Sequence, residues 1–149
     1  MAFDMPVGDI TSANATLVLT VDELFPQGIR LSMFATDQAM DMSELTVAET
    51  RMGVDGNMVA GFVPTPKEVT VTLEAASPSY ESLAALYRAT ERKRGAYRCT
   101  LVASAPAVGR TFTWTEGVLV RGTPVPAFRK TLEPTSWTFR FARLNVSEA

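Results

Sequence analysis

Four carboxylates lie close together in one polar stretch of this sequence and are its best candidates for metal binding. Asp37, Asp41, Glu44 and Glu49 fall within residues 36–52, and their oxygens are the ligand type that Ca²⁺ prefers. A calcium-binding loop also needs closely alternating Asp or Asn ligands around a central glycine, and this stretch has no such spacing. We therefore expect a solvated acidic arm here and no metal site.

Nucleophilic chemistry has little support in the composition. The chain contains no histidine, which removes the Ser–His and Cys–His pairs and the usual zinc ligand sets. Its one cysteine, Cys99, lies in the strand-like run AYRCTLVAS, where we expect a small buried apolar side chain. A single cysteine also suits a reducing cytosol. We expect no enzymatic activity and no cofactor.

Three further motifs have plainer structural interpretations. The segment from Gly53 to Gly56 is not followed by GK[ST], so a hairpin turn at Asp55-Gly56 is expected instead of a phosphate loop. The basic run that ends at Arg94 closes a predicted helix and is expected to face solvent or another subunit. Trp114 and Trp137 lie in strand patterns and are expected to anchor the core or an interface.

Composition limits the class of protein. A chain of 149 residues with 46% hydrophobic and 20% charged residues is typical of one folded domain. Its net charge of −2 argues against a surface that grips nucleic acid. No basic, apolar leader begins the sequence, and no apolar run approaches the roughly 18 residues that span a bilayer. A soluble, cytosolic chain without membrane anchoring is expected.

The hydrophobic pattern predicts a mainly β protein with one helix, arranged as a β-sandwich or barrel. Residues 25–28 are predicted as a turn and residues 122–126 as a turn-rich connection. Residues 1–13 are predicted as an N-terminal arm and residues 36–57 as an extended arm that ends in the hairpin turn. The predicted strands are residues 15–21, 29–35, 58–63, 69–75, 96–105, 111–121 and 136–146.

The single helix is predicted at residues 78–94. Ser77 is its expected N-cap and Pro78 its first residue, where the missing N–H of proline costs nothing. Gly95 is expected to end the helix as the glycine after the C-cap. The apolar stripe that should face the sheet consists of Tyr80, Leu83, Ala84, Leu86 and Tyr87.

From residue 44 onward the pattern resembles the tail tube proteins of contractile-tailed bacteriophages, which are related to the tube subunits of contractile injection systems. The resemblance lies in the order of its parts across residues 12–146, and only residues 44–87 are motif-like. These parts are the acidic arm ending in ETRMG, then DG, VTVTL, the ASPS helix start and the closing strand WTFRF.

The resemblance implies a structural role for the whole chain as a single tail tube domain. Tail tube proteins form hexameric rings that stack into a hollow tube, and DNA passes through it during ejection. By this resemblance the chain binds copies of itself, contacts sheath, baseplate and tail terminator proteins, and lies in the tail of the virion after synthesis in the host cytoplasm. DNA would pass without specific binding.

Two surfaces follow from the resemblance. Residues 36–57 would be a stacking arm that reaches the neighbouring ring, and residues 78–94 would be a flanking helix on the outside of the barrel. The candidate stacking residues are Asp37, Asp41, Glu44, Leu45, Val47, Glu49 and Arg51. The candidate surface of the helix toward a neighbouring subunit or the sheath consists of Arg88, Glu91, Arg92 and Arg94.

Two other functions remain open on the sequence. The chain could be the inner-tube subunit of a bacteriocin-type or secretion machine, which shares the fold. It could also be a β-sandwich module that binds carbohydrate or peptide, for which Tyr97, Trp114 and Trp137 would be the binding aromatics. Neither the number of subunits in a ring nor the strand face that lines the channel follows from the sequence.

Overall fold

The structure, a computed structural model, describes residues 15–31, 40–106 and 108–148. Nine strands and one helix are found in this part of the chain, and a mainly β fold with one helix is thereby confirmed. The elements are β1 (Thr16–Val21), β2 (Phe25–Leu31), β3 (Met40–Met42), β4 (Ala48–Met52), β5 (Met58–Phe62), β6 (Lys67–Leu73), α1 (Pro78–Lys93), β7 (Cys99–Ala105), β8 (Arg110–Gly122) and β9 (Thr135–Glu148).

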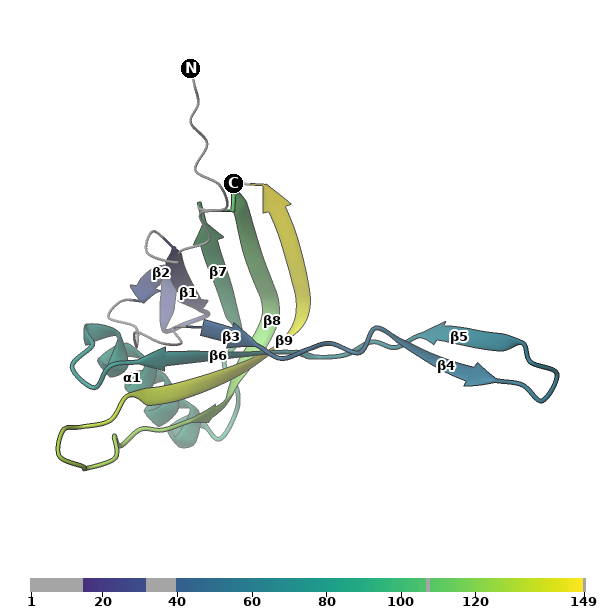
Figure 1. Ribbon diagram of the computed structural model, residues 1–149. Coiled ribbons are helices and arrows are strands. Elements are labelled where there is room, and N and C mark those ends of the chain that lie inside the picture. Colours follow the sequence, from purple (N-terminus) through teal and green to yellow (C-terminus); the bar gives the residue numbers. More distant parts are fainter. Residues whose placement is uncertain (1–14, 32–39, 107, 149) are drawn as a thin grey trace, which may run out of the picture.

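Seven strands form one antiparallel sheet in the order β2-β1-β7-β8-β9-β6-β3, and β4 and β5 form a separate two-stranded ribbon. The long strands β8 and β9 pair with each other along their whole length. β7 pairs only with the first part of β8, as far as Gly117, and β6 pairs only with the first part of β9, as far as Phe141. The two long strands therefore belong to two overlapping sheet segments, and Figure 1 shows them bending from one segment into the other.

The bend has a local cause in β8. Glu116 takes a left-handed conformation with φ 56°, and the register between β7 and β8 shifts at this point. An extra residue of this kind bends a strand and increases its twist. Gly117 follows directly, and a Cβ there would lie 2.0 Å from the Phe141 ring, so the tight crossing of β8 over β9 requires glycine.

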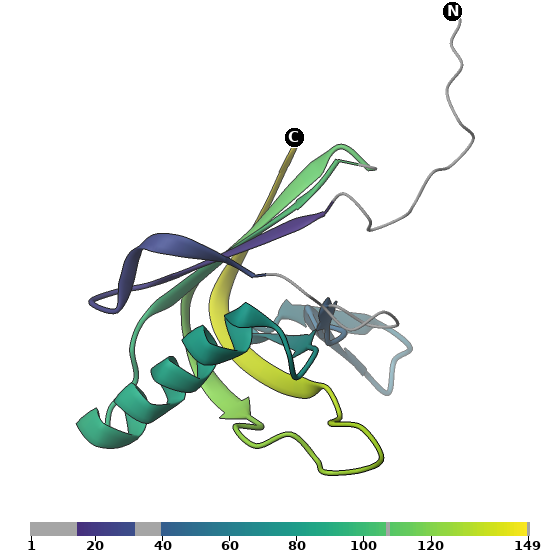
Figure 2. The ribbon, with the colours of Figure 1, turned by 90° about the vertical axis from the view of Figure 1, so that its left-hand side faces the viewer.

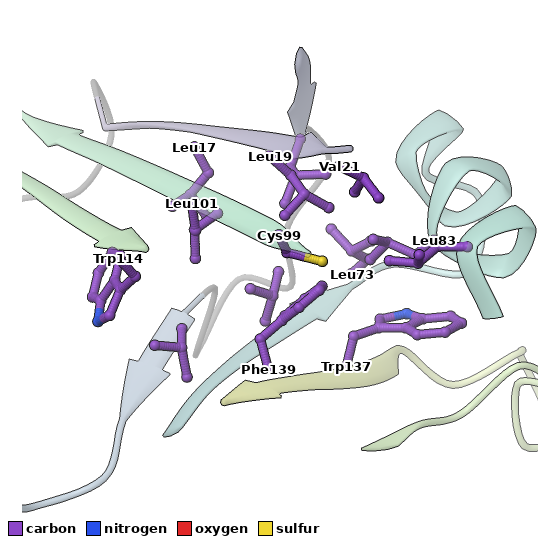
Figure 3. Close-up of a cluster of buried hydrophobic side chains, with 14 of the residues drawn as sticks. Leu17, Leu19, Val21, Leu73, Leu83, Cys99, Leu101, Trp114, Trp137 and Phe139 are labelled. Atoms are coloured by element: carbon purple, nitrogen blue, oxygen red, sulfur yellow. The ribbon is translucent and has the colours of Figure 1, made fainter. Parts of the chain in front are cut away.

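The core lies between the concave side of the sheet and helix α1 (Figures 2 and 3). In β1 the side chains of Leu17, Leu19 and Val21 are buried while the residues between them are half-buried, the expected alternation. Trp137 is fully buried and meets the Tyr80 ring of the helix edge-on, with ring centroids 6.2 Å apart. The largest other buried side chains are Phe139, Phe141, Leu31, Leu73, Leu83, Leu86 and Leu101.

The predicted start of the helix is confirmed, but its predicted end is wrong by one residue. Ser77 is the N-cap, and its side chain accepts a hydrogen bond from the Ser79 N–H at 3.1 Å. At the other end Arg94, and not Gly95, takes the left-handed conformation, with φ 55°, and its N–H bonds the Thr90 carbonyl. A single left-handed residue that satisfies a last-turn carbonyl closes the helix.

The turn predicted at residues 25–28 is also wrong. Those residues form the start of β2, and the chain reverses one step earlier at residues 22–24, where Glu23 has φ 74°. β2 is an edge strand, and an edge tolerates a proline such as Pro26, which has no N–H to donate. The predicted strand at 29–35 is described only as far as Leu31, and the predicted arm at 1–13 lies outside the described residues.

Candidate functional site

The ribbon, Ala48–Phe62, projects far from the sheet (Figure 1). Its tip is the predicted hairpin turn, in which Gly56 has φ +87° and donates a hydrogen bond to the Gly53 carbonyl. The Asn57 N–H donates to Asp55 Oδ1 at 3.1 Å. This bond, with a second from the Asn57 side chain, lowers the pKa of Asp55 below its ordinary value. The tip is thus fixed by its own hydrogen bonds although the ribbon has no core.

The two faces of the ribbon differ in chemistry. Residues that pair directly across two antiparallel strands carry their side chains on the same face. The pairs Ala48↔Phe62, Thr50↔Ala60 and Met52↔Met58 therefore form one face, and Glu49↔Gly61 and Arg51↔Val59 form the other. We call the first the apolar face. Every residue of β4 and β5 is exposed, so the apolar face faces solvent in the single chain.

Three hydrogen bonds hold the base of the ribbon. The Val63 N–H donates to the Val47 carbonyl at 3.0 Å, and the Ser43 N–H donates to the Glu68 carbonyl at 3.1 Å. The Thr65 hydroxyl donates to the Thr46 carbonyl across the same neck. Pro64 and Pro66 flank that threonine and stiffen the extended connection, as proline does by fixing φ.

The predicted stacking residues do not all lie on the ribbon. Glu49 and Arg51 are on its polar face, and Val47 is at its base. Asp41 is instead in β3, where it pairs with Thr70, and Glu44 and Leu45 lie in the connection between β3 and β4. Asp37 lies outside the described residues. The prediction overlooked the apolar face because it treated residues 58–63 as a strand of the main sheet; pairing the two runs about Asp55-Gly56 would have revealed it.

The sheet leaves free edges at both ends of one segment. β2 pairs with β1 on one side only and ends the strand order. At the other end β6 leaves β9 at Phe141, so residues 142–148 of β9 pair with β8 on one side and with no described strand on the other. Free strand edges expose unpaired N–H and C=O groups that pair readily with another chain.

The convex face of the sheet, away from helix α1, is rich in hydroxyl groups. The register places Thr16 opposite Ser104 and Thr113 opposite Val102, and the Thr70 and Thr138 hydroxyls are 3.1 Å apart. We call this surface the hydroxyl face, which valines 18, 102 and 118 interrupt. Its hydroxyl-bearing members are Thr16, Thr20, Thr70, Thr72, Thr100, Ser104, Thr111, Thr113, Ser136 and Thr138.

Three arginines beside the hydroxyl face are paired with two carboxylates. Glu68 accepts hydrogen bonds from Arg140 at 2.9 Å and from Arg121 at 2.6 Å. The bonds from these two guanidinium groups lower the pKa of Glu68 below its ordinary value. Arg143, near the bend, donates to Glu116 at 2.7 Å. Arg140 and Arg143 are thus both paired with carboxylates.

The predicted surface of helix α1 is exposed as a group, with Arg88, Glu91, Arg92 and Arg94 all solvent-facing. Glu91 accepts a hydrogen bond from the Tyr87 hydroxyl at 2.8 Å, which raises the pKa of Tyr87. An open groove of about 740 Å³ separates this end of the helix from residues 119–122 of β8. The contact of this surface with a neighbouring subunit or the sheath stays a prediction.

The cysteine and the tryptophans that the sequence offered for chemistry or binding are buried in the fold. Cys99 is buried, and this burial raises the pKa of its thiol to about 12. Trp114 and Trp137 are also buried, so the aromatic binding surface considered for a carbohydrate or peptide module is not formed. Among the described residues no three His, Cys, Asp or Glu side chains gather as a metal site. The one described helix is too short and too polar to cross a bilayer.

Solved structures share the fold of this chain. The chain resembles a chain of the anti-feeding prophage baseplate with TM-score 0.60 and 11% identity, covering 99% of this chain and 98% of that one. It resembles a chain of the PVC sheath-tube complex, an extracellular contractile injection system, with TM-score 0.57 and 13% identity over 99% and 93%. These likenesses establish the fold.

The sequence comparison defines the family. A family model described as "Tail fiber protein gp32" matches residues 8–145, and the chain belongs to that family. No curated protein matches the chain. A third structure, the PVC sheath/tube terminator, matches with TM-score 0.54 and 14% identity over 98% of both chains. The expected resemblance to tube subunits of contractile systems is thereby confirmed in the fold.

Proposed function

We propose that this chain is a structural subunit that assembles with copies of itself into stacked rings, forming the inner tube of a contractile tail. The observation that carries the proposal is the ribbon, which exposes its mainly apolar face without cover from the described part of the chain. Exposed apolar surfaces of this kind mark protein interaction sites. A two-stranded ribbon is also marginal by itself in water, so a partner that packs on it would stabilise it.

The free sheet edges support ring formation. The edge of β2 and the edge of residues 142–148 lie at opposite ends of the same sheet segment. Pairing one edge with the other in the next copy continues the sheet from subunit to subunit. Such head-to-tail contacts close into a ring when the rotation per subunit fits, and closure removes both of these free edges. Six subunits is the number that the resemblance implies.

The hydroxyl face supports a channel through which DNA passes without being held. If α1 lies outside the ring, the opposite face of the sheet lines the interior. That face carries hydroxyl groups, and Arg121, Arg140 and Arg143 each bond a carboxylate of Glu68 or Glu116. Arg30, opposite Val18, makes no ion pair with a described residue. Tight non-specific binding of DNA depends on cationic side chains at its phosphates, and the described part of this face offers few of them unpaired.

The remaining partners are proposed from the assemblies in which similar structures are found. The similar structures come from a baseplate, a sheath-tube complex and a tube terminator. Sheath, baseplate and terminator proteins are accordingly the proposed partners, and the exposed helix residues Arg88, Glu91, Arg92 and Arg94 the proposed surface toward the sheath or a neighbour. The proposed location is the tail of a virion or of a related injection device. The proposed role is structural and not enzymatic.

A second candidate has its own support. The family is described as a tail fibre protein, which favours a fibre or another tail component over a tube. Both roles require self-association through exposed surfaces, and they differ in shape. A tube has a central channel, whereas a fibre has none.

Electron microscopy of the purified full chain tests the proposal. Rings or tubes with a central hole are expected, and solid filaments would favour the fibre. A chain that stays monomeric at every concentration contradicts both.

A matched deletion isolates the ribbon. Because Val63 N and Val47 O are already 3.0 Å apart, Ala48–Phe62 can be replaced by a short glycine linker without moving the sheet. We expect the shortened chain to keep its circular dichroism spectrum and cooperative unfolding but to form no tubes. Tubes as long as those of the full chain would contradict the role of the ribbon.

A further inference from the structure

A second apolar projection lies at the end of the molecule opposite the ribbon. Residues 123–134 connect β8 to β9, and Figure 1 shows this connection at one extreme and the ribbon at the other. Figure 2 agrees, since the connection lies toward the viewer and the ribbon lies at the back. The connection exposes Phe128 at 80%, Val125 at 64% and Leu132 at 49% of their surfaces. We call residues 123–134 the apolar loop.

The apolar loop is held in shape by its own bonds. Phe128 and Leu132 form a β-bridge, and the Glu133 N–H donates to the Ala127 carbonyl at 3.0 Å. The Tyr80 hydroxyl of helix α1 donates to the Pro124 carbonyl and ties the loop to the body. Its large side chains are therefore displayed on an ordered scaffold, and little further ordering is needed for them to bind.

The charges of the two projections are complementary. The ribbon carries two carboxylates, Glu49 and Asp55, against the single guanidinium of Arg51. The apolar loop carries Arg129 and Lys130 against Glu133, and the Arg129–Glu133 ion pair of 3.2 Å leaves Lys130 as its surplus cation. Opposite charges bordering two apolar patches favour one orientation of contact and disfavour contact of each patch with its own kind.

We propose that the apolar face of the ribbon in one copy packs against the apolar loop of a second copy. Phe128 and its neighbours would cover Met52, Met58 and Phe62, and Lys130 would lie beside Asp55 at the tip of the ribbon. This contact joins two different surfaces, so the growing assembly always keeps one free ribbon at one end and one free loop at the other. The proposal rests on the proposed function and identifies the receiving surface of the stacking arm.

Cysteine pairs test which surfaces meet. The full-length variants Ala60→Cys, on the apolar face, and Leu132→Cys, on the apolar loop, are mixed and oxidised with copper phenanthroline. Cys99 is buried with a thiol pKa of about 12 and stays out of the reaction. We expect a disulfide-linked dimer that contains one copy of each variant, identified by a mass tag on one of them.

Two controls make the pairing specific. Gly61→Cys lies next to Ala60 but on the polar face of the ribbon, and it is expected to cross-link weakly with Leu132→Cys. Val108→Cys offers a competing acceptor at the turn between β7 and β8, where Val108 is also exposed. Cross-linking of Ala60→Cys to Val108→Cys in place of Leu132→Cys would overturn the proposed contact.

A concentration series adds an independent measurement. Phe128→Ser is expected to raise the protein concentration needed for assembly by about tenfold or more, since a large apolar side chain leaves the contact. Thr131→Ser, on the same loop, is the matched control and is expected to assemble as the natural chain does. If the natural chain assembles, but Ala60→Cys and Leu132→Cys do not cross-link and Phe128→Ser assembles at the same concentration as the natural chain, only the proposed contact is overturned. A natural chain that never assembles overturns the proposed function as well.

Discussion

The curved sheet and the ribbon are built from the same kind of antiparallel strand, but only the sheet has a core. In β6, every second residue is buried against helix α1 and the neighbouring strands, whereas no residue of β4 or β5 is buried. Burial of apolar area is the main source of folding stability, so the sheet and helix must supply nearly all of it. The exposed apolar residues of the ribbon add nothing to the folding stability of the single chain. This difference indicates that the sheet and helix α1, which we call the body, provide the fold and that the ribbon provides a binding surface.

The largest expected effect on stability comes from the core between the sheet and helix α1. Trp137→Ala removes a fully buried side chain that contacts Tyr80 and is bonded through its Nε1 to Thr135. Loss of such a side chain and the cavity it leaves are expected to lower the free energy of unfolding by about 3–5 kcal/mol. Urea denaturation measures this loss. A loss below about 1 kcal/mol would mean that the sheet is not closed over its core as described.

A pair of glycines gives the sharpest contrast between the two regions. A Cβ at Gly117 would lie 2.0 Å from Phe141, whereas a Cβ at Gly61 on the ribbon meets nothing within 4 Å. Gly117→Ala is expected to lower the free energy of unfolding by about 1–3 kcal/mol through overpacking. Gly61→Ala, the matched control, is expected to change it by less than about 0.5 kcal/mol. Equal effects in urea denaturation would contradict the contrast.

The sequence predicts the body better than the ribbon, for a physical reason. The alternation in residues 15–21 and the Ser77-Pro78 helix start are local signals, and both are found as expected. Two errors depend on longer-range context, because Pro26 is accepted in an edge strand and residues 58–62 pair with the arm instead of joining the sheet. A third is local, since Arg94 takes the left-handed conformation in place of the glycine beside it.

The stacking residues predicted from the sequence stay a prediction, and the structure adds the apolar face of the ribbon as a second candidate surface. Charge stands out in a sequence, and four of the seven predicted stacking residues are acidic. The apolar face becomes visible only when β4 and β5 are placed in register, because it draws alternate residues from both strands. The apolar loop was likewise predicted only as a turn-rich connection, since its position opposite the ribbon is a property of the folded sheet.

A smaller effect on the pH dependence of stability distinguishes a carboxylate in an ion pair from one without. The bonds from Arg140 and Arg121 lower the pKa of Glu68, so its contribution to stability is complete above the pKa of unfolded glutamate and disappears as pH falls through the lower folded value. We expect the stability advantage of the natural chain over Glu68→Gln to be constant near neutral pH and to shrink below about pH 4.

Urea denaturation at several pH values measures that advantage. Glu49→Gln is the control on the ribbon, where Glu49 makes no ion pair with any described residue, and it should show no comparable change with pH. An advantage over Glu68→Gln that stayed constant down to pH 2 would contradict a role for the ionised carboxylate.

The smallest expected effect on folding comes from the ribbon itself. Phe62→Ser removes a large apolar side chain, yet that side chain is 78% exposed, so the free energy of unfolding should change by less than about 0.5 kcal/mol. Unfolding is measured at a concentration where the chain is monomeric, because assembly would stabilise the folded state by mass action. The same variant should fail to form tubes under conditions in which the natural chain does. A substitution that leaves the body unchanged and abolishes assembly would separate folding from function at one residue, whereas a large loss of folding stability would mean that the ribbon belongs to the core after all.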